Sequence, residues 1–315
     1  MSNKITPSMW AEKNRVLVGS PFGKRWDPER TPELCGVMDA LAVSGVEKVV
    51  LMASPQTGKT EAMLNVLGWQ MEMETTGHKC LVLAPSETEA EALSRERIQP
   101  MLNHLLIDPE SVHVRGADNL SAIVGIAWRV VLAESIDKFL GWEDERGGSL
   151  AMAERKSYMW GPNRKVFLTG SPSAWSSRIG TEFQLADVRF SRTGKCPVCG
   201  TEHFMTLRYF DSELMQYECP ACHARWDGFM RLKAIAEGGW YDWKYERPLE
   251  EALADPNLPC NIVTFRLPAI CSSLWTMEDL ARWKKKILEL REKGDDYEQM
   301  MKADLAAMPG GASYA

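Results

Sequence analysis

The pattern of hydrophobic and polar residues predicts strands that alternate with helices through the first half of the chain. Short runs rich in Val, Leu and Ile predict strands at 46–54, 79–85 and 164–173, with a further strand inside 122–135. Segments with helical spacing lie between them, at 31–45, 59–74 and 86–102. This alternation favours an α/β fold with a mainly parallel sheet and crossover helices.

Two of the predicted helices carry specific signals. In 59–74 the apolar residues Met63, Leu64, Leu67 and Met71 recur at helical spacing. Ser86 is followed three residues later by a glutamate, which is the pattern of a capping box at a helix start.

The remaining segments suggest a division of the chain. We expect an irregular N-terminal lead-in over 1–30, an α/β core over 31–187 and a separate module over 188–230. Residues 231–315 would complete the core and end in a charged helical tail and a linker-like end, "MPGGASYA". No internal repeat or low-complexity tract interrupts this order.

Composition narrows the class of protein. The 315 residues are 45% hydrophobic with a formal net charge of −6, so the chain can bury a large core. It contains no apolar run of 18 residues and starts without a secretory signal, so we expect a cytoplasmic protein without membrane contact. The negative charge argues against a protein that simply coats nucleic acid. Basic clusters at 188–195 and 282–291 are either solvated faces or part of a local groove.

The stretch "LMASPQTGKTEAML" contains a candidate phosphate-binding loop between a predicted strand and a predicted helix. Backbone N–H groups of such a loop cradle phosphates, the lysine reaches the outer phosphates and the threonine hydroxyl binds Mg²⁺. Ala53 stands where the strict motif has glycine, and an ordinary helix start is the alternative. The candidate ATP-binding residues are Ser54, Gln56, Thr57, Gly58, Lys59 and Thr60.

Four of the eight cysteines form two C-x-x-C pairs, Cys196 with Cys199 and Cys219 with Cys222. This spacing predicts a zinc ribbon in which four thiolates hold one structural Zn²⁺ and leave no open position for catalysis. We expect the module mainly to hold a small segment together, with Arg189, Arg192 and Lys195 as a possible edge for DNA phosphates. His223 is expected to be a neighbour of the site and not a ligand.

The order of these motifs resembles one family. "SPQTGKTE", "LVLAPSETEAEALSRERIQPML", "VVLAESIDKF", "FLTGSPS" and the two cysteine pairs follow one another as in the ATPase part of the large terminase subunit of lambda-type tailed phages. The resemblance implies a RecA-like P-loop ATPase that uses ATP and Mg²⁺ to drive double-stranded DNA through a portal into a capsid in the host cytoplasm. It also implies a ring of copies and a small terminase subunit as partners.

The resemblance places the catalytic acids after the third predicted strand. The family normally has Asp-Glu there, whereas this chain has Glu134, Ser135 and then Asp137. One acid supports Mg²⁺ through water and another orients the attacking water. Glu134 can fill one role, and either Asp137 fills the other or hydrolysis is slow. Glu134 as a surface acid and Asp137 as a helix cap are the structural alternatives.

A positive charge is also needed on the transferred phosphoryl group. Some relatives carry an arginine inside the loop, at the position of Pro55 here, so the finger must come from elsewhere. Arg97 and Arg178 are the candidates, with surface or salt-bridge roles as alternatives. Residues 169–173, "TGSPS", resemble the family's coupling motif, which senses the γ-phosphate.

The family's nuclease would begin near the end of this chain, and its acidic clusters are not apparent in the sequence. We therefore expect no nuclease activity from this chain, with a separate nuclease chain as a possible partner. Two other functions remain open. One is a helicase-like translocase, which would usually need a second lobe, and the other is an ATP-binding assembly or regulatory subunit with weak hydrolysis.

Overall fold

The computed structural model describes residues 5–17, 25–73, 79–140, 148–172, 177–244, 246–257 and 259–292. The chain divides into two compact units. The first unit comprises Met1–Pro28, Val37–Val50 and Lys59–Gly170, and the second comprises Glu29–Gly36, Leu51–Gly58 and Ser171–Ala315.

The sheet of the first unit is parallel. Its strands run in the order β5 (Lys165–Gly170), β4 (Val130–Ala133), β2 (Cys80–Ala84) and β3 (Val112–Gly116), and each neighbouring pair is parallel. The start of β1 (Lys48–Ala53) lies beside β5, where the Val166 N–H donates to the Glu47 carbonyl at 2.8 Å. Every residue of β1, β2 and β4 is buried, as expected for strands covered on both faces.

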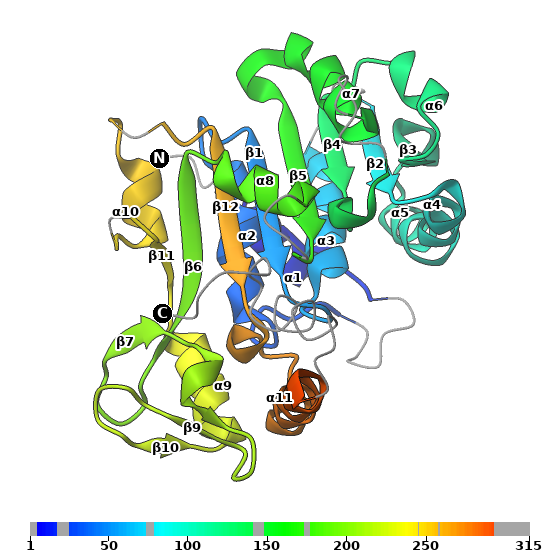
Figure 1. Cartoon of the computed structure of the whole chain (residues 1–315). Coiled ribbons are helices and arrows are strands. Elements are labelled where there is room, and N and C mark those ends of the chain that lie inside the picture. The colour runs from blue at the N-terminus through cyan, green and yellow to red at the C-terminus, as the bar shows by residue number, and fades with distance from the viewer. Residues whose placement is uncertain are drawn as a thin grey trace. The chain divides into compact units, whose positions relative to one another are not determined.

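Helices and strands alternate along this unit (Figure 1). They are α1 (Pro7–Asn14), α3 (Lys59–Met73), α4 (Glu87–Leu93), η2 (Ser94–Ile98), α5 (Gln99–Leu105), α6 (Ser121–Val124) and α7 (Gly148–Ser157). The predicted helix over 86–102 is therefore one run with a π-helical segment, η2, at its centre. The predicted N-cap is confirmed, because the Glu89 N–H donates to Ser86 Oγ, while the Glu89 carboxylate accepts from the Ser86 hydroxyl.

Three local features differ from the sequence-based expectation. The lead-in expected to be irregular contains α1, which Thr6 caps and which buries Trp10 against Gly68 of α3. Only Val130–Ala133 of the segment 122–135 forms a strand, since α6 occupies its start. Strand β3 was not predicted from the sequence. In the structure only Val112 and Gly116 of its residues are buried.

The second unit is mixed. Strand β6 (Val188–Lys195) pairs in parallel with β12 (Ile262–Leu267) and antiparallel with β11 (Trp240–Asp242) and β7 (Glu202–Phe204). The end of β1 lies beside β12, and the Ser54 N–H donates to the Leu267 carbonyl at 3.0 Å. A small antiparallel sheet contains β8 (Phe210–Asp211), β9 (Gln216–Glu218) and β10 (Arg225–Trp226).

The helices of this unit are α8 (Arg178–Gln184), α9 (Gly228–Glu237), α10 (Leu249–Ala254) and α11 (Met277–Glu292), while α2 (Pro32–Asp39) has residues in both units. Helix α11 falls in the predicted tail, whose residues 293–315 lie outside the described part of the chain. Single turns of 3₁₀ helix complete the structure: η1 (Ala40–Ala42), η3 (Pro109–Ser111), η4 (Ile136–Lys138), η6 (Leu207–Tyr209) and η7 (Ala269–Cys271), with a longer η5 (Tyr158–Asn163).

The two basic clusters differ in exposure, because the first is mostly buried in β6 whereas most described residues of the second are exposed on α11. Residues 188–195 form β6, and Arg192 in it is only 5% exposed, donates to the Ile235 carbonyl at 2.6 Å and stacks over Trp240. The expectation that Arg192 belongs to a DNA-contacting edge was wrong, because the strand buries it. In the second cluster, Lys284 of α11 donates to the carbonyls of Leu207 and Phe210.

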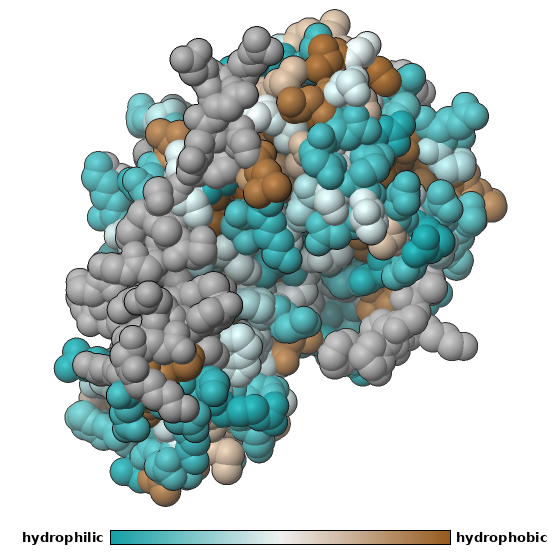
Figure 2. Space-filling model, turned by 45° about the vertical axis from the view of Figure 1, so that its right-hand side comes forward, coloured by the Kyte–Doolittle hydropathy of each residue, from teal (hydrophilic) through white to brown (hydrophobic). Residues whose placement is uncertain are grey.

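The visible face in Figure 2 carries mainly hydrophilic residues with hydrophobic ones scattered among them. Within the described residues, no helix combines the length and apolar character that crossing a membrane requires.

Candidate functional site

The loop after β1 is held by its own side chains and by its neighbour in the second unit. Thr57 Oγ1 donates to the Ser54 carbonyl at 2.8 Å, and both residues are fully buried. The Ser54 N–H is occupied by the carbonyl of Leu267. Ser54 and Thr57, both predicted to bind phosphate, therefore shape the loop through these bonds.

Two residues of the loop have positive φ angles, Gln56 at 57° and Gly58 at 82°. A Cβ at Gly58 would also come within 2.9 Å of Leu34. Glycine is required at position 58 for both reasons. Gln56 has a side chain and still adopts the left-handed conformation, which is unfavourable and must be maintained by its surroundings.

Helix α3 begins at Lys59, directly after the loop, so Lys59 and Thr60 occupy its first turn (Figure 1). The first N–H groups of a helix and the positive end of its dipole favour an anion at this position. The order of strand, turn with positive φ angles and helix start is the local structure that a phosphate-binding loop needs.

Thr60 meets Glu134 in the first unit. Thr60 Oγ1 donates to Glu134 Oε2 at 3.0 Å, although 74 residues separate them. Glu134 follows the last residue of β4, and its N–H is bound to the Leu83 carbonyl of β2 at 3.0 Å. The chain thus brings together a hydroxyl and a carboxylate, two oxygen ligands of the kind that Mg²⁺ prefers.

Burial raises the pKa of Glu134 above its ordinary value. The Thr60 hydrogen bond and the positive charge of Arg97 act in the opposite direction and favour the ionised carboxylate. A bound divalent cation would add to them and hold Glu134 ionised.

Ser135 and Asp137 follow Glu134 in a tight turn. Ser135 has a φ of 53°, in the left-handed region, and Asp137 lies in η4 with its side chain half-buried. The extended backbone of β4 therefore does not continue past Glu134, and Asp137 lies outside the strand.

The two arginine candidates are both in ion pairs. Arg97 of η2 pairs with Glu61, which follows Thr60 in α3 and also binds the buried Arg15 at 2.9 Å. Arg178 pairs with Glu182 one turn further along α8, with N···O 2.6 Å. The positive charge of Arg97 lowers the pKa of Glu134.

The segment that resembles a coupling motif is anchored to backbone carbonyls. In the first unit Thr169 Oγ1 donates to the Ala133 carbonyl at 3.5 Å, next to Glu134. In the second unit Ser171 Oγ donates to the Ala53 carbonyl at 3.0 Å, at the start of the loop. Ser173 lies outside the described residues.

The two cysteine pairs meet in one cluster. The sulfur atoms of Cys196, Cys199, Cys219 and Cys222 all lie within 4.8 Å of one another. Two of the separations are 3.8 Å and 3.9 Å, between Cys196 and Cys222 and between Cys199 and Cys219. A tetrahedral ion with Zn–S bonds of about 2.3 Å would separate its sulfurs by about 3.8 Å, so the cluster fits Zn²⁺.

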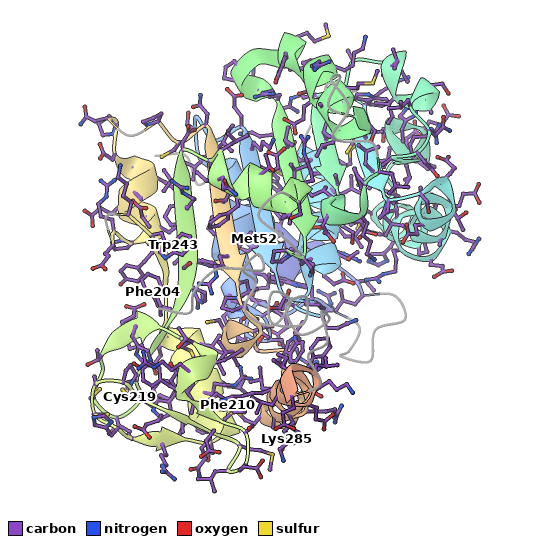
Figure 3. All side chains as sticks on the ribbon, in the orientation of Figure 1. Met52, Phe204, Phe210, Cys219, Trp243 and Lys285 are labelled. Atoms are coloured by element: carbon purple, nitrogen blue, oxygen red, sulfur yellow. The ribbon has the colours of Figure 1, made fainter. Side chains whose placement is uncertain are left out.

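Each pair lies on a turn of the same design. The Gly200 N–H donates to the Cys196 carbonyl at 2.9 Å, and the His223 N–H donates to the Cys219 carbonyl at 2.9 Å. Gly200 and His223 are equivalent positions, with φ of 74° and 59°. The His223 ring is not part of the sulfur cluster and contacts Glu218 through Nδ1 at 2.9 Å. Figure 3 shows Cys219 in this module.

Sequence reasoning missed Glu61 and the role of the 268–276 segment. Glu61 follows Thr60 directly, yet only the fold brings Arg15 and Arg97 to its carboxylate. Trp275 Nε1–H donates to the Pro55 carbonyl of the loop at 2.9 Å. No local sequence pattern predicts this contact.

Comparisons with known proteins give the family. A family model described as the phage terminase large subunit gpA, ATPase domain, matches residues 20–105 and 108–240. Among solved structures, the HK97 bacteriophage large terminase is similar with a TM-score of 0.55 and 10% identity, covering 98% of this chain and 56% of that chain. The ATPase domain of the Thermus phage P74-26 large terminase gives a TM-score of 0.46 and 11% identity, covering 85% of this chain and 92% of that chain.

At these identities the HK97 structure supports the fold alone, and the P74-26 value is too low to add to the argument. No curated protein matches the chain. The family model covers more than half of the chain, and the loop, the Thr60–Glu134 pair and the mostly parallel sheet agree with it. The chain therefore belongs to the family of phage terminase large subunit gpA ATPase domains, the ATPases of viral DNA packaging.

Proposed function

We propose that residues 54–60 bind the phosphates of ATP and that Thr60 and Glu134 form the metal side of the site. The observation that carries this proposal is the 3.0 Å hydrogen bond between Thr60 and Glu134 at the start of α3. Lys59 would contact the outer phosphates, and the backbone N–H groups at the helix start would hold the rest. Mg²⁺, when bound, supplies positive charge that stabilises the transferred phosphoryl group.

Glu134 is the main acidic residue in this proposal. It supports the metal through water or orients the attacking water, and its partly buried position keeps it close to Thr60. Asp137 is proposed for the remaining role, because Ser135 has no carboxylate. Asp137 lies in η4, which begins two residues after Glu134.

Arg97 is proposed as the group that neutralises the developing charge. Its pairing with Glu61 keeps it in the first unit near the start of α3. Arg178 is the weaker candidate, since its contact with Glu182 fixes it along its own helix.

The four cysteines are proposed to hold one structural Zn²⁺. The sulfur separations and the two matched turns support this assignment. Such a site would join β7 and the β8–β10 sheet, and it would add to the small cluster of rings around Tyr217 and Trp226. The zinc site is proposed mainly to stabilise this small segment. Any DNA contact of the module would not involve Arg192, which is buried.

The substrate of the motor is proposed to be double-stranded DNA, moved into a capsid through its portal in the host cytoplasm. A ring of copies and a small terminase subunit would be its partners, and a nuclease would be a separate activity. An ATP-binding assembly or regulatory subunit is the competing function that Ser135 favours, because a missing second acid would slow hydrolysis.

The test compares ATP turnover by the purified chain with and without linear double-stranded DNA, beside the Lys59→Ala variant. A motor subunit predicts turnover that DNA stimulates and that Lys59→Ala removes. Tight ATP binding without turnover under both conditions would favour the assembly function. The same samples, incubated with supercoiled plasmid and Mg²⁺ or Mn²⁺, test the expectation that this chain does not cut DNA.

A further inference from the structure

The connection from β12 to α11, residues 268–276, contacts the phosphate-binding loop within the second unit. Trp275 is 5% exposed, and its Nε1–H donates to the Pro55 carbonyl at 2.9 Å. Leu274 lies 3.3 Å from the position that a Cβ of Gly58 would occupy. Trp275 therefore hydrogen-bonds to the loop at Pro55, and Leu274 packs against it at Gly58.

The hydrogen bond from Trp275 fixes one particular peptide plane. The Pro55 carbonyl and the Gln56 N–H belong to the same trans peptide, so they point in opposite directions. Because Trp275 holds the carbonyl, the Gln56 N–H is directed away from Trp275. Gln56 is also the non-glycine residue with a φ of 57°, a conformation that needs external support. Rotation of this peptide would reverse its N–H.

The 268–276 segment is itself fixed by a buried carboxylate. Glu33 of α2 has no exposed surface and accepts from the Ser273 N–H at 2.8 Å, from Ser273 Oγ at 2.8 Å and from Ser272 Oγ at 3.3 Å. Leaving a buried carboxyl group without its hydrogen-bond partners is unfavourable, so these bonds restrain the segment.

A buried guanidinium holds the same segment through its carbonyls. Arg231 of α9 is 1% exposed and donates to the carbonyls of Ile270 at 2.8 Å, of Ser272 at 3.1 Å and of Trp275. Helix α9 follows β10 and the second cysteine pair directly, with Asp227 as its N-cap. Arg231 thus connects the end of the four-cysteine module to Trp275.

We propose that Trp275 is a positioning residue for ATP binding, which holds the Pro55–Gln56 peptide in the orientation that the phosphates need, and that Arg231 holds Trp275 in place. This inference rests on the proposed phosphate-binding role of residues 54–60. Neither residue touches the reacting atoms, so both act on ATP affinity more than on the chemical step.

The test replaces Trp275 by Phe, which keeps an aromatic ring and removes the N–H donor. The matched control is Trp283→Phe, because Trp283 lies in α11 and its ring packs against Trp275 at 5.5 Å between centroids. ATP affinity is measured by calorimetry with Mg²⁺, KM and kcat by steady-state turnover, and stability by thermal unfolding. We expect Trp275→Phe to weaken ATP binding and raise KM about fivefold, the effect of one neutral hydrogen bond.

In the same experiment Trp283→Phe should leave ATP affinity within about twofold of wild type, and both variants should unfold at similar temperatures. Equal ATP affinity in Trp275→Phe and wild type would overturn the positioning role. A wild-type protein that fails to bind ATP would instead overturn the proposed function of the loop, so the two failures are distinguishable.

Arg231→Lys provides the second variant. It keeps the positive charge but replaces the planar guanidinium, whose two terminal nitrogens reach three carbonyls, by a single ammonium nitrogen. We expect KM for ATP to rise at least threefold with a smaller change in kcat. A folded Arg231→Lys protein with unchanged KM would remove Arg231 from the proposal, and if this variant does not fold, Trp275→Phe still decides the role of the indole.

Discussion

The hydroxyl of Thr60, in the first turn of α3, donates a 3.0 Å hydrogen bond to the carboxylate of Glu134, which follows β4. Because burial raises the pKa of Glu134 and this hydrogen bond lowers it, the two effects can be separated by mutation. Thr60→Val keeps the shape and removes the hydroxyl, so it should raise the pKa of Glu134 further.

The measurement is a carboxyl ¹³C NMR titration, with Glu134→Gln identifying the resonance. In wild type we expect Glu134 to titrate above the ordinary 4.5, and higher still in Thr60→Val. Since the protonated form cannot support a metal, kcat/KM should fall as the pH drops through this raised pKa. A lower pKa in Thr60→Val than in wild type would contradict the hydrogen bond.

The four-cysteine cluster predicts one zinc ion for each chain, measurable by elemental analysis of the purified protein. Cys199→Ser and Cys222→Ser should lose the zinc and lower the unfolding temperature by roughly 5–10 °C. Cys260→Ser is the control, since Cys260 is half-buried outside the cluster. Full zinc content in both cluster variants would contradict a four-thiolate site.

The equivalent turn positions Gly200 and His223 predict opposite effects of mutation. His223→Gly should keep the zinc and leave stability unchanged or increase it by up to about 1 kcal/mol, because glycine tolerates a positive φ. Gly200→Ala should destabilise the module by about 1 kcal/mol. Denaturant unfolding with parallel zinc analysis measures both, and zinc loss in His223→Gly would show that His223 is a ligand after all.

Replacing Gly68 of α3 by alanine should cause a steric clash, although helix propensity alone would predict higher stability. A Cβ at Gly68 would lie 2.0 Å from the Trp10 ring, whose Nε1 is bound to Glu72 at 2.7 Å. We expect Gly68→Ala to reduce the free energy of unfolding by about 1–3 kcal/mol. Gly125→Ala, which meets no atom within 4 Å, should be neutral or slightly stabilising in the same denaturant titration.

The strongly patterned parts of this structure were predictable from sequence. The strand before the 54–60 loop, the helix after it and the N-cap at Ser86 have local signals, and all three are present. The pairing of cysteines into one cluster followed from spacing alone. The order of motifs also gave the family, which the family model confirms.

The remaining features depend on contacts distant in sequence. Arginine is usually exposed, yet Arg192 is buried in β6, where it contacts Ile235 and Trp240. Trp10 becomes a core residue only because α3 offers Gly68 opposite it. Glu61 and Trp275 take part in the candidate site through partners 36 to 220 positions away, which no local periodicity encodes.

The proposed function depends on ATP hydrolysis by this chain with Lys59, Thr60 and Glu134. The most direct test is single-turnover ATP hydrolysis by wild type, Lys59→Ala, Glu134→Gln and Asp137→Asn, with ATP binding measured on the same samples. We predict that Glu134→Gln binds ATP but hydrolyses it at least about 100-fold more slowly, whereas Lys59→Ala loses binding. Asp137→Asn should also slow hydrolysis, by a smaller factor. Wild-type rates of hydrolysis in Glu134→Gln would contradict the account.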